Sequence, residues 1–294
     1  MADQLQSIIS EIIAQLGGSE EKIDPNRPLE GVFASVDDAL SAARMAHQTL
    51  VVMPLEKRKE IIANIRRRCA EKAKLFSQMA VDETGLGRVE DKIKKKLLVI
   101  HKTPGVEILE SQSYTGDHGL TLIERAPFGV IASITPCTNP TETIINNGIG
   151  MVAGGNAVTF NTHPSAKRVS AYCIDVINRA SMEVGGPSNL MTCVQHPTIA
   201  SANELMTHKG TDLVVVTGGG AVVRAAMQSG KKCVAAGPGN PPVVVDETAD
   251  LDLAARGIYN GASFDNNIIC VDEKEVMAVE SIFDPLMDRI ERLG

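Results

Sequence analysis

The sequence lacks tryptophan and is poor in aromatic residues, which together make up 3% of its 294 residues. It also lacks an excess of basic residues, because 36 acidic side chains outnumber 29 lysines and arginines and leave a formal net charge of −7. A nucleic-acid-binding surface usually combines basic patches with aromatic stacking platforms. Both shortages therefore argue against a general nucleic-acid binder.

Further absences restrict the class of protein. No apolar run approaches the ~20 residues that a membrane-spanning helix needs, and Asp3 and Glu11 interrupt the N-terminal region in a way that a secretory signal does not. The six cysteines form no C-x-x-C pair, which argues against a zinc site and against a disulfide scaffold. Apolar residues make up an ordinary 44% and permit a sizeable core. We therefore expect a cytoplasmic globular protein that binds no metal, no nucleic acid and no membrane.

The first 30 residues predict a helix followed by a linker. Within residues 1–18, apolar side chains such as Leu5, Ile9 and Ile12 recur at three- and four-residue intervals, as on one face of an amphipathic helix. Residues 19–30 are polar and contain two prolines, which is typical of a linker. The helix either packs on its own domain or serves as a docking peptide whose apolar stripe needs a groove elsewhere.

Helical periodicity continues up to residue 100. The predicted helices cover residues 39–50, 55–81 and 89–100, and Ser35 with Asp38 resembles a capping box before the first of them. The third helix is strongly basic, with lysines that include Lys92, Lys95 and Lys96. A solvated helix face is the simpler interpretation of these lysines, and attraction of a phosphorylated ligand is the alternative.

From residue 128 onward, strand-like runs alternate with helix-length segments. The predicted strands cover residues 130–135, 157–161, 190–194, 213–217, 232–236 and 242–246, and a further strand and helix follow over 275–279 and 281–293. Such alternation is typical of an α/β fold, in which helices cover both faces of a parallel sheet. Uncharged strand centres agree, because parallel strands are buried on both sides. We therefore predict a Rossmann-like parallel sheet with flanking helices, and we expect its ligands beyond the carboxyl ends of the strands.

Small or turn-forming residues follow four of these strands. The segments are 136–140, 162–164, the triple glycine 218–220, and 237–240. The triple glycine opens a helix and is a candidate phosphate-binding turn, with a plain tight turn as the alternative. A match to the dinucleotide fingerprint at Gly148, Gly150 and Ala153 is rejected, because it precedes a strand instead of following one.

Cys270 is the residue with the strongest candidate chemistry. It follows the last predicted helix of the α/β region, in the segment 263–270. Many cysteines are simply small buried apolar residues, and no Ser-His-Asp or Cys-His pair in the sequence marks Cys270 as a nucleophile. The residues alone leave a structural and a catalytic role open. We interpret four other cysteines as structural: Cys69, Cys173, Cys193 and Cys233.

Several segments resemble the aldehyde dehydrogenase superfamily. The main ones are 124–131, 135–141 and 153–157, with support from 31–39, 83–88, 103–107 and 237–242. Within that superfamily the chain is most similar to the CoA-acylating branch, and there to the propionaldehyde and acetaldehyde dehydrogenases of bacterial microcompartments. The resemblance runs from about residue 31 to the end of the sequence.

The resemblance implies a role for each of these positions. It places Cys270 at the nucleophile, whose thiolate attacks an aldehyde and, after hydride transfer to NAD, passes the acyl group from its thioester to CoA. Asn139 and the Cys270 backbone N–H would hold the oxyanion, with Thr138 as the alternative to Asn139. The implied cofactor-binding residues are Thr135, Pro136, Cys137, Thr138, Asn161, His163, Gly218, Gly219, Val222 and Gly237.

Two positions differ from the hydrolytic branch of the superfamily. Hydrolytic members carry a water-activating Glu where this chain has Ala236. A thiol, with a reference pKa of about 8.5, needs such a base far less than water does, so the replacement favours transfer to CoA. Asn161 stands where hydrolytic members hold the adenosine ribose with a Lys. The cofactor is expected to be NAD rather than NADP.

The resemblance also implies a domain organisation. Residues 1–18 would dock on microcompartment shell or cargo proteins, 19–30 would form a linker, 31–246 an NAD-binding domain with an N-terminal helical segment, and 247–294 the start of a catalytic domain. We expect that domain to be incomplete, because family members continue well beyond the nucleophile, and we expect the family to form homo-oligomers. The expected function is oxidation of a short aldehyde, propanal or acetaldehyde. The alternatives are a non-catalytic nucleotide-binding, shell-docking fragment and a hydrolytic aldehyde dehydrogenase.

Overall fold

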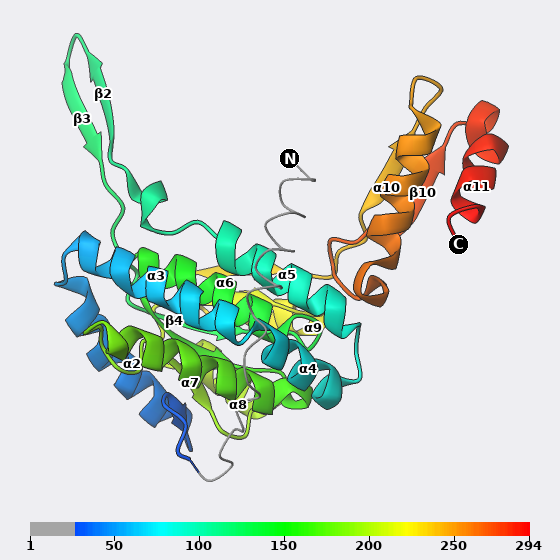
Figure 1. The fold of residues 1–294 in the computed structure, drawn as a ribbon. Coiled ribbons are helices and arrows are strands. Elements are labelled where there is room, and N and C mark those ends of the chain that lie inside the picture. Colours follow the sequence, from blue (N-terminus) through cyan, green and yellow to red (C-terminus); the bar gives the residue numbers. More distant parts are fainter. Residues whose placement is uncertain (1–26) are drawn as a thin grey trace.

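The computed structural model describes residues 27–294, so the predicted N-terminal helix and most of the predicted linker lie outside the described residues. The described chain forms a body around a six-stranded sheet, a projecting hairpin and a smaller C-terminal lobe (Figure 1). No helix within residues 27–294 is long and apolar enough to cross a membrane.

The main sheet is parallel throughout, with the strand order β1-β6-β5-β4-β7-β8. Every residue of the three strands β4, β5 and β6 is buried, because helices cover both faces of the sheet. This arrangement confirms the predicted Rossmann-like sheet. The strands are β1 (Val32–Phe33), β4 (Val130–Ile134), β5 (Ala157–Asn161), β6 (Met191–Val194), β7 (Leu213–Thr217) and β8 (Cys233–Ala236).

The direction of strand addition reverses beside β4. From β4 the chain builds β5 and then β6 on one side, and it later returns to the other side of β4 to build β7 and β8. In open parallel sheets, ligands bind beyond the carboxyl ends of the strands at such a reversal. The topology therefore predicts a ligand site at the loops that follow β4 and β7.

Two helical layers enclose the sheet. One layer packs side chains such as Ile61, Ile145 and Ile177 against one face, and the other packs Leu40, Leu205 and Ala226 against the opposite face. Full burial of one large aliphatic side chain contributes about 1.5–3 kcal/mol, so these layers hold the sheet. The first layer contains α3 (Leu55–Glu71), α5 (Val89–Lys102), α6 (Pro140–Ala153) and α7 (Lys167–Glu183); the second contains α2 (Val36–Val51), α8 (Ile199–Thr207) and α9 (Gly220–Met227).

The predicted helix over residues 55–81 is wrong in one respect, because it is two helices. The chain breaks at Lys72, and α4 (Ala73–Thr84) continues in a new direction against α5 and α7. The change of direction buries Phe76 completely and places its ring edge-on to Tyr172, with 5.8 Å between the ring centroids. The reason for the break is tertiary packing, which local periodicity does not record.

A β-hairpin that the sequence analysis did not predict projects from the body (Figure 1). Its strands are β2 (Gln112–Gly116) and β3 (Gly119–Ile123), paired antiparallel around a tight turn in which Gly119 has a φ of +131°. All residues of both strands are exposed. Because neither face of the hairpin is buried against the body, its sequence lacks the burial pattern that marked the other strands.

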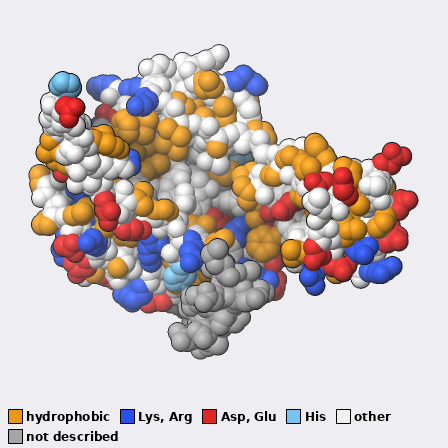
Figure 2. Space-filling view, turned by 90° about the horizontal axis from the view of Figure 1, so that it is seen from above, with side chains coloured by type: hydrophobic (Ala, Val, Ile, Leu, Met, Phe, Trp, Pro, Cys, Tyr) orange, Lys and Arg blue, Asp and Glu red, His pale blue; other side chains and the backbone are white. Residues whose placement is uncertain are grey.

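The C-terminal lobe contains a second small sheet. Strand β9 (Pro242–Val245) lies outside the main sheet and pairs in parallel with β10 (Glu275–Ala278). Helices α10 (Leu251–Ser263) and α11 (Phe283–Glu291) pack on this sheet around Val245, Ile258 and Leu286. Figure 2 shows acidic and apolar side chains mixed on the surface of this lobe. The predicted strand 242–246 therefore exists, but it belongs to the lobe.

Candidate active site

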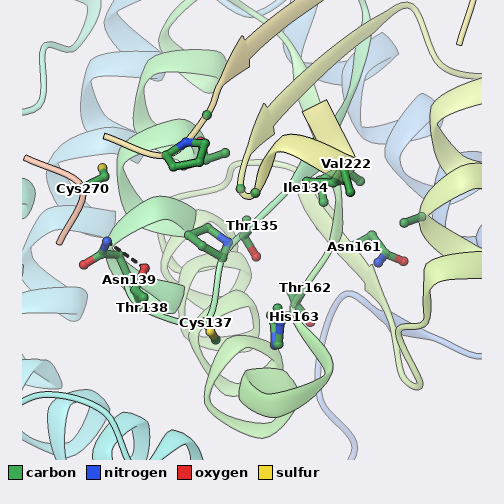
Figure 3. Close-up of a pocket in the computed structure, with 18 of the residues that line it drawn as sticks. Ile134, Thr135, Cys137, Thr138, Asn139, Asn161, Thr162, His163, Val222 and Cys270 are labelled. Carbon is green, nitrogen blue, oxygen red and sulfur yellow. Dashed lines mark hydrogen bonds between the residues drawn. The ribbon is translucent and has the colours of Figure 1, made fainter. Parts of the chain in front are cut away.

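A cavity of about 660 Å³ lies at the carboxyl ends of the main-sheet strands and reaches the segment before the lobe's β10 (Figure 3). Its volume is in the range of small-molecule sites. The structure brings every predicted site residue to this cavity, whereas the assigned roles stay predictions. Those lining residues are Thr135, Pro136, Cys137, Thr138, Asn139, Asn161, His163, Gly218, Gly219, Val222, Gly237 and Cys270.

The end of the cavity near β4 and β7 fits a dinucleotide. The Thr135 hydroxyl is buried and has no hydrogen-bond partner among residues 27–294, so it is available to a ligand group. Gly219 precedes α9, and a Cβ added at Gly219 or Gly237 would meet no atom within 4 Å. Bare backbone before a helix N-terminus is suited to a phosphate group. These features fit the predicted NAD.

Asn161 shapes the cavity wall by joining β5 to α8. Its Oδ1 accepts a hydrogen bond from Ser201 Oγ at 2.6 Å, and its Nδ2 donates to the Thr198 carbonyl at 3.3 Å. Thr198 and Ser201 form the capping box that begins α8. Both ends of the Asn161 amide are thus engaged by protein groups, which fixes the side chain predicted to face the adenosine ribose.

Cys270 differs from the core cysteines in exposure. It is exposed, whereas Cys69, Cys173 and Cys193 are buried. Burial raises the pKa of the Cys69 and Cys193 thiols to about 12 and raises the pKa of Cys173 well above its ordinary value. Since the thiolate is the reactive form, the buried thiols are unreactive at neutral pH. Two cysteines line the cavity, Cys137 and Cys270, and Cys270 is the more exposed of the two, so its thiol is the more accessible to a molecule bound there.

The segment before Cys270 has an unusual backbone. Asp265, Asn266 and Asn267 all have left-handed φ angles, of 47°, 57° and 57°. Such conformations cost about 1–3 kcal/mol each for non-glycine residues and persist only where other contacts enforce them. The segment therefore needs firm anchors on both sides, and the structure provides them.

The first anchor is the fully buried carboxylate of Asp265. It accepts hydrogen bonds from the Arg88 backbone N–H at 2.8 Å, from Lys92 Nζ at 3.1 Å and from Lys95 Nζ at 2.5 Å. The opposing Gly87 has a φ of +76°, and a Cβ there would lie 2.0 Å from Asp265 Oδ1. Helix α5 and the turn before it thus hold the loop that leads to Cys270 through hydrogen bonds to Asp265.

The second anchor follows Cys270. Lys274 Nζ donates to Asn267 Oδ1 at 2.6 Å and to the Ile269 carbonyl at 3.0 Å. Asp272 Oδ2 accepts from the Ile269 backbone N–H at 3.1 Å, and burial raises the pKa of this carboxyl. Sequence reasoning did not assign Lys274, which also lines the cavity. In the sequence, Lys274 was marked only by its place in the charged segment 272–275, shortly after Cys270.

The interpretation of the basic helix as a solvated face is wrong for its central lysines. Lys92 and Lys96 are 0% exposed and Lys95 is 8% exposed. Spacings of three and four residues place them on one face of α5, which packs against α6 and the loop around Asp265. Their acidic partners are distant in sequence, as in the 2.6 Å pair of Lys96 Nζ with Glu142 Oε1. The helix sequence by itself could not reveal those partners.

Asn139 lies at the start of α6, within reach of these lysines. Its Oδ1 accepts from Lys95 Nζ at 2.6 Å, and its Nδ2 donates to Thr138 Oγ1 at 3.2 Å. Figure 3 shows Asn139 and Cys270 on the same side of the cavity. The structure thus gathers a thiol, an amide and the turns suited to a dinucleotide.

The sequence model of the aldehyde dehydrogenase family matches residues 30–293 of this chain. The chain belongs to this family. It is 53% identical over 265 residues to an acetylating acetaldehyde dehydrogenase of Bilophila wadsworthia, covering 90% of this chain and 54% of the relative. It is 40% identical over 291 residues to the propanal dehydrogenase (CoA-propanoylating) of Salmonella typhimurium, covering 99% of this chain and 63% of the relative.

Solved structures of aldehyde dehydrogenases agree with the fold. A propionaldehyde dehydrogenase from the Clostridium phytofermentans fucose utilisation microcompartment superposes with a TM-score of 0.87 at 48% identity, over 90% of this chain and 60% of that protein. The Rhodopseudomonas palustris propionaldehyde dehydrogenase, solved with bound CoA and an acylated cysteine, gives 0.87 at 45% identity, over 90% and 61%. The chain thus spans between half and two thirds of these relatives, and the predicted aldehyde dehydrogenase fold is confirmed.

Proposed function

We propose that this chain is a CoA-acylating aldehyde dehydrogenase, which converts propanal or acetaldehyde, NAD and CoA into acyl-CoA and NADH. The observation that carries the proposal is the exposed Cys270 in the wall of a cavity that also contains Asn139 and the glycine turns. The relatives named above as acetylating or CoA-propanoylating enzymes support the same reaction.

The chemistry follows from the groups around Cys270. The thiolate sulfur forms a bond to the aldehyde carbon, and the carbonyl oxygen takes the negative charge. The Asn139 amide and the Cys270 backbone N–H are the donors proposed to stabilise this oxyanion. NAD, when bound by the loops after β4 and β7, supplies the hydride acceptor. Loss of hydride from the former aldehyde carbon leaves a thioester on Cys270, and attack by the CoA thiol forms acyl-CoA and restores the Cys270 thiolate.

Ala236 favours transfer to CoA over hydrolysis. It ends β8 directly before the cavity-lining Gly237, at the position where the resemblance places the water-activating Glu of hydrolytic members. A methyl group cannot take a proton from water, whereas the CoA thiol ionises readily enough to attack without such a base. A CoA thioester is therefore the expected product.

The test is NADH absorbance after mixing the chain with NAD, CoA and propanal or acetaldehyde. We expect NADH formation that requires CoA and is lost in Cys270→Ser but retained in Cys233→Ser, which removes a thiol from β8. NADH formed without CoA, together with a free acid, would support the hydrolytic alternative. No NADH from the unaltered chain would support the non-catalytic alternative.

We also infer that the enzyme works inside a bacterial microcompartment and docks there through residues 1–18. The amphipathic pattern of that segment supports this, as does the microcompartment origin of the Clostridium phytofermentans relative. The test is co-purification of the full chain with microcompartment shells, compared with a chain that lacks residues 1–18. Equal recovery of the two chains would contradict the docking role.

A further inference from the structure

Lys95 touches both halves of the proposed catalytic machinery. Its Nζ lies 2.5 Å from Asp265 Oδ2, in the loop that leads to Cys270, and 2.6 Å from Asn139 Oδ1 at the start of α6. The lysine is 8% exposed and comes from α5, which is distant in sequence from Asp265 and Cys270. One ammonium group therefore joins the nucleophile loop to the amide proposed to hold the oxyanion.

The contact with Lys95 fixes which way the Asn139 amide faces. An ammonium group has donors and no acceptor, so it can bond the amide oxygen but not the amide nitrogen. With Oδ1 held by Lys95, Nδ2 is turned away from the ammonium group, and one of its hydrogens is donated to Thr138 Oγ1 at 3.2 Å. The second hydrogen of Nδ2 has no hydrogen-bond partner within residues 27–294. Asn139 lines the cavity with Cys270, so this hydrogen is free for a ligand oxygen.

We propose that Lys95 is a positioning residue, which holds the Asn139 amide with its nitrogen toward the reacting carbonyl oxygen and ties that amide to the Cys270 loop through Asp265. The proposal rests on the function proposed above, in which Cys270 attacks a carbonyl carbon. Lys95 itself need not touch the substrate. Its effect is to keep a donor in place before charge develops on the oxygen, which is the way such donors lower the barrier.

Lys92 offers a matched comparison. It lies one turn before Lys95 on the same face of α5, is 0% exposed and also bonds Asp265, at 3.1 Å. Its second partner is the Thr138 backbone carbonyl at 3.2 Å, and it makes no hydrogen bond to the Asn139 side chain. Loss of Lys92 therefore removes a buried lysine and an anchor of the loop, but leaves the bond that orients the amide.

The test compares two reactions of the Cys270 thiolate in the full chain. With p-nitrophenyl acetate, the sulfur forms a bond to the ester carbon, an oxyanion develops, and the bond to nitrophenolate then breaks, which leaves acetyl-Cys270. With iodoacetamide, the sulfur displaces iodide from a CH₂ carbon and no oxyanion forms. The rates of both reactions depend on the position of the Cys270 loop and on the reactivity of the thiolate. Only the acylation rate also depends on the oxyanion donor. Cys270→Ser gives the background of both rates.

Loss of Lys95 should affect the two reactions unequally. Deleting an oxyanion donor slows such reactions by about 10²–10³-fold. Because Lys95→Met misplaces the donor without deleting it, we expect acylation to slow by about tenfold or more. The rate of alkylation should change by less than about twofold. Lys92→Met should change both rates by the same factor. Lys95→Arg, which keeps a charged donor, should restore part of the acylation rate. Asn139→Ala should show the same selective loss, and Lys95→Met should add little to it.

Melting temperatures identify variants that do not fold. If Lys95→Met does not fold, Lys95→Gln replaces it, because Gln keeps a polar side chain there but lacks the charge and the length with which Nζ reaches Asn139 Oδ1 at 2.6 Å. Equal slowing of acylation and alkylation in the Lys95 variant, or no slowing of either, would overturn the positioning role while the proposed function stands. Failure of the unaltered chain to acylate Cys270 at all would overturn both proposals together.

Discussion

The position of the Cys270 backbone depends on a glycine in another loop, Gly239. A Cβ added at Gly239 would lie 1.9 Å from the Cys270 carbonyl oxygen, which is far inside van der Waals contact. Gly237, two residues earlier, has no atom within 4 Å of such a Cβ. The backbone at residue 239 thus packs directly against the Cys270 backbone, and only glycine allows this approach.

We therefore predict that Gly239→Ala displaces the Cys270 loop and lowers the rate of NADH formation about 100-fold, because a shift of about 1 Å in a reacting group costs that much. The measurement is kcat with propanal, NAD and CoA. Gly150→Ala is the control, because a Cβ there meets no atom within 4 Å and Gly150 does not line the cavity, so kcat should stay within about twofold of that of the unaltered chain. A Gly239→Ala enzyme with unchanged kcat would show that the Cys270 position tolerates the shift.

The lysines of α5 also connect this helix to α6, because Lys96 forms a buried ion pair with Glu142 of α6. Burial alone would raise the pKa of Glu142, but Lys96 and Lys95 oppose it and lower the pKa to about 2. The reference pKa of an unfolded Glu is about 4.3, so the folded state favours the ionised form. This contribution to the free energy of unfolding is fully present above about pH 4.3 and is lost as the pH falls toward 2.

We predict that acid weakens the α5–α6 contact as the pH falls from about 4.3 to about 2, with up to about 3 kcal/mol of stability lost over the whole titration. The measurement is the free energy of unfolding in urea at several pH values. The double variant Glu142→Gln/Lys96→Met removes the titration without leaving an unpaired buried charge and should show a shallower acid loss. Identical pH profiles for the two proteins would contradict this role of Glu142.

The strands of the main sheet could be predicted from sequence more readily than the hairpin and the side-chain contacts around it. The strands β4 to β8 were predictable because each is a short, uncharged run followed by a turn. The site residues around Asn139 and Gly218 were predictable because they follow those strands, with the resemblance supplying Cys270. The β2–β3 hairpin was not predictable from burial, because its strands are exposed. The Lys95 contacts were not predictable either, because Asp265 lies far away in sequence.

Within the whole molecule, the C-terminal lobe has a small core of its own. Val245, Ala255, Ile258 and Leu286 form that core, separate from the two layers that hold the main sheet. A small core gives less stabilisation, and such units open before the rest of a protein does. The lobe includes α10 and β10, which flank the Cys270 loop along the chain, so its stability bears on the site.

We predict faster amide hydrogen exchange in α10, β10 and α11 than in β4 to β7. Leu286→Ala, which truncates a side chain that is 1% exposed, should destabilise the lobe by about 2–5 kcal/mol and accelerate exchange there alone. The control is Leu205→Ala, which truncates an equally buried side chain on α8 and should accelerate exchange in the body. Exchange by mass spectrometry that rises everywhere in Leu286→Ala would show that lobe and body unfold as one unit.

In the proposed reaction Cys270 carries the acyl group, and the mass of the Cys270 peptide after reaction tests this directly. The chain is incubated with propanal and NAD in the absence of CoA, digested at acidic pH and analysed by peptide mass spectrometry. We expect a propanoyl group on the Cys270 peptide, absent without NAD and removed when CoA is added. A propanoyl group on another cysteine, or an unmodified Cys270 peptide while NADH accumulates, would contradict it.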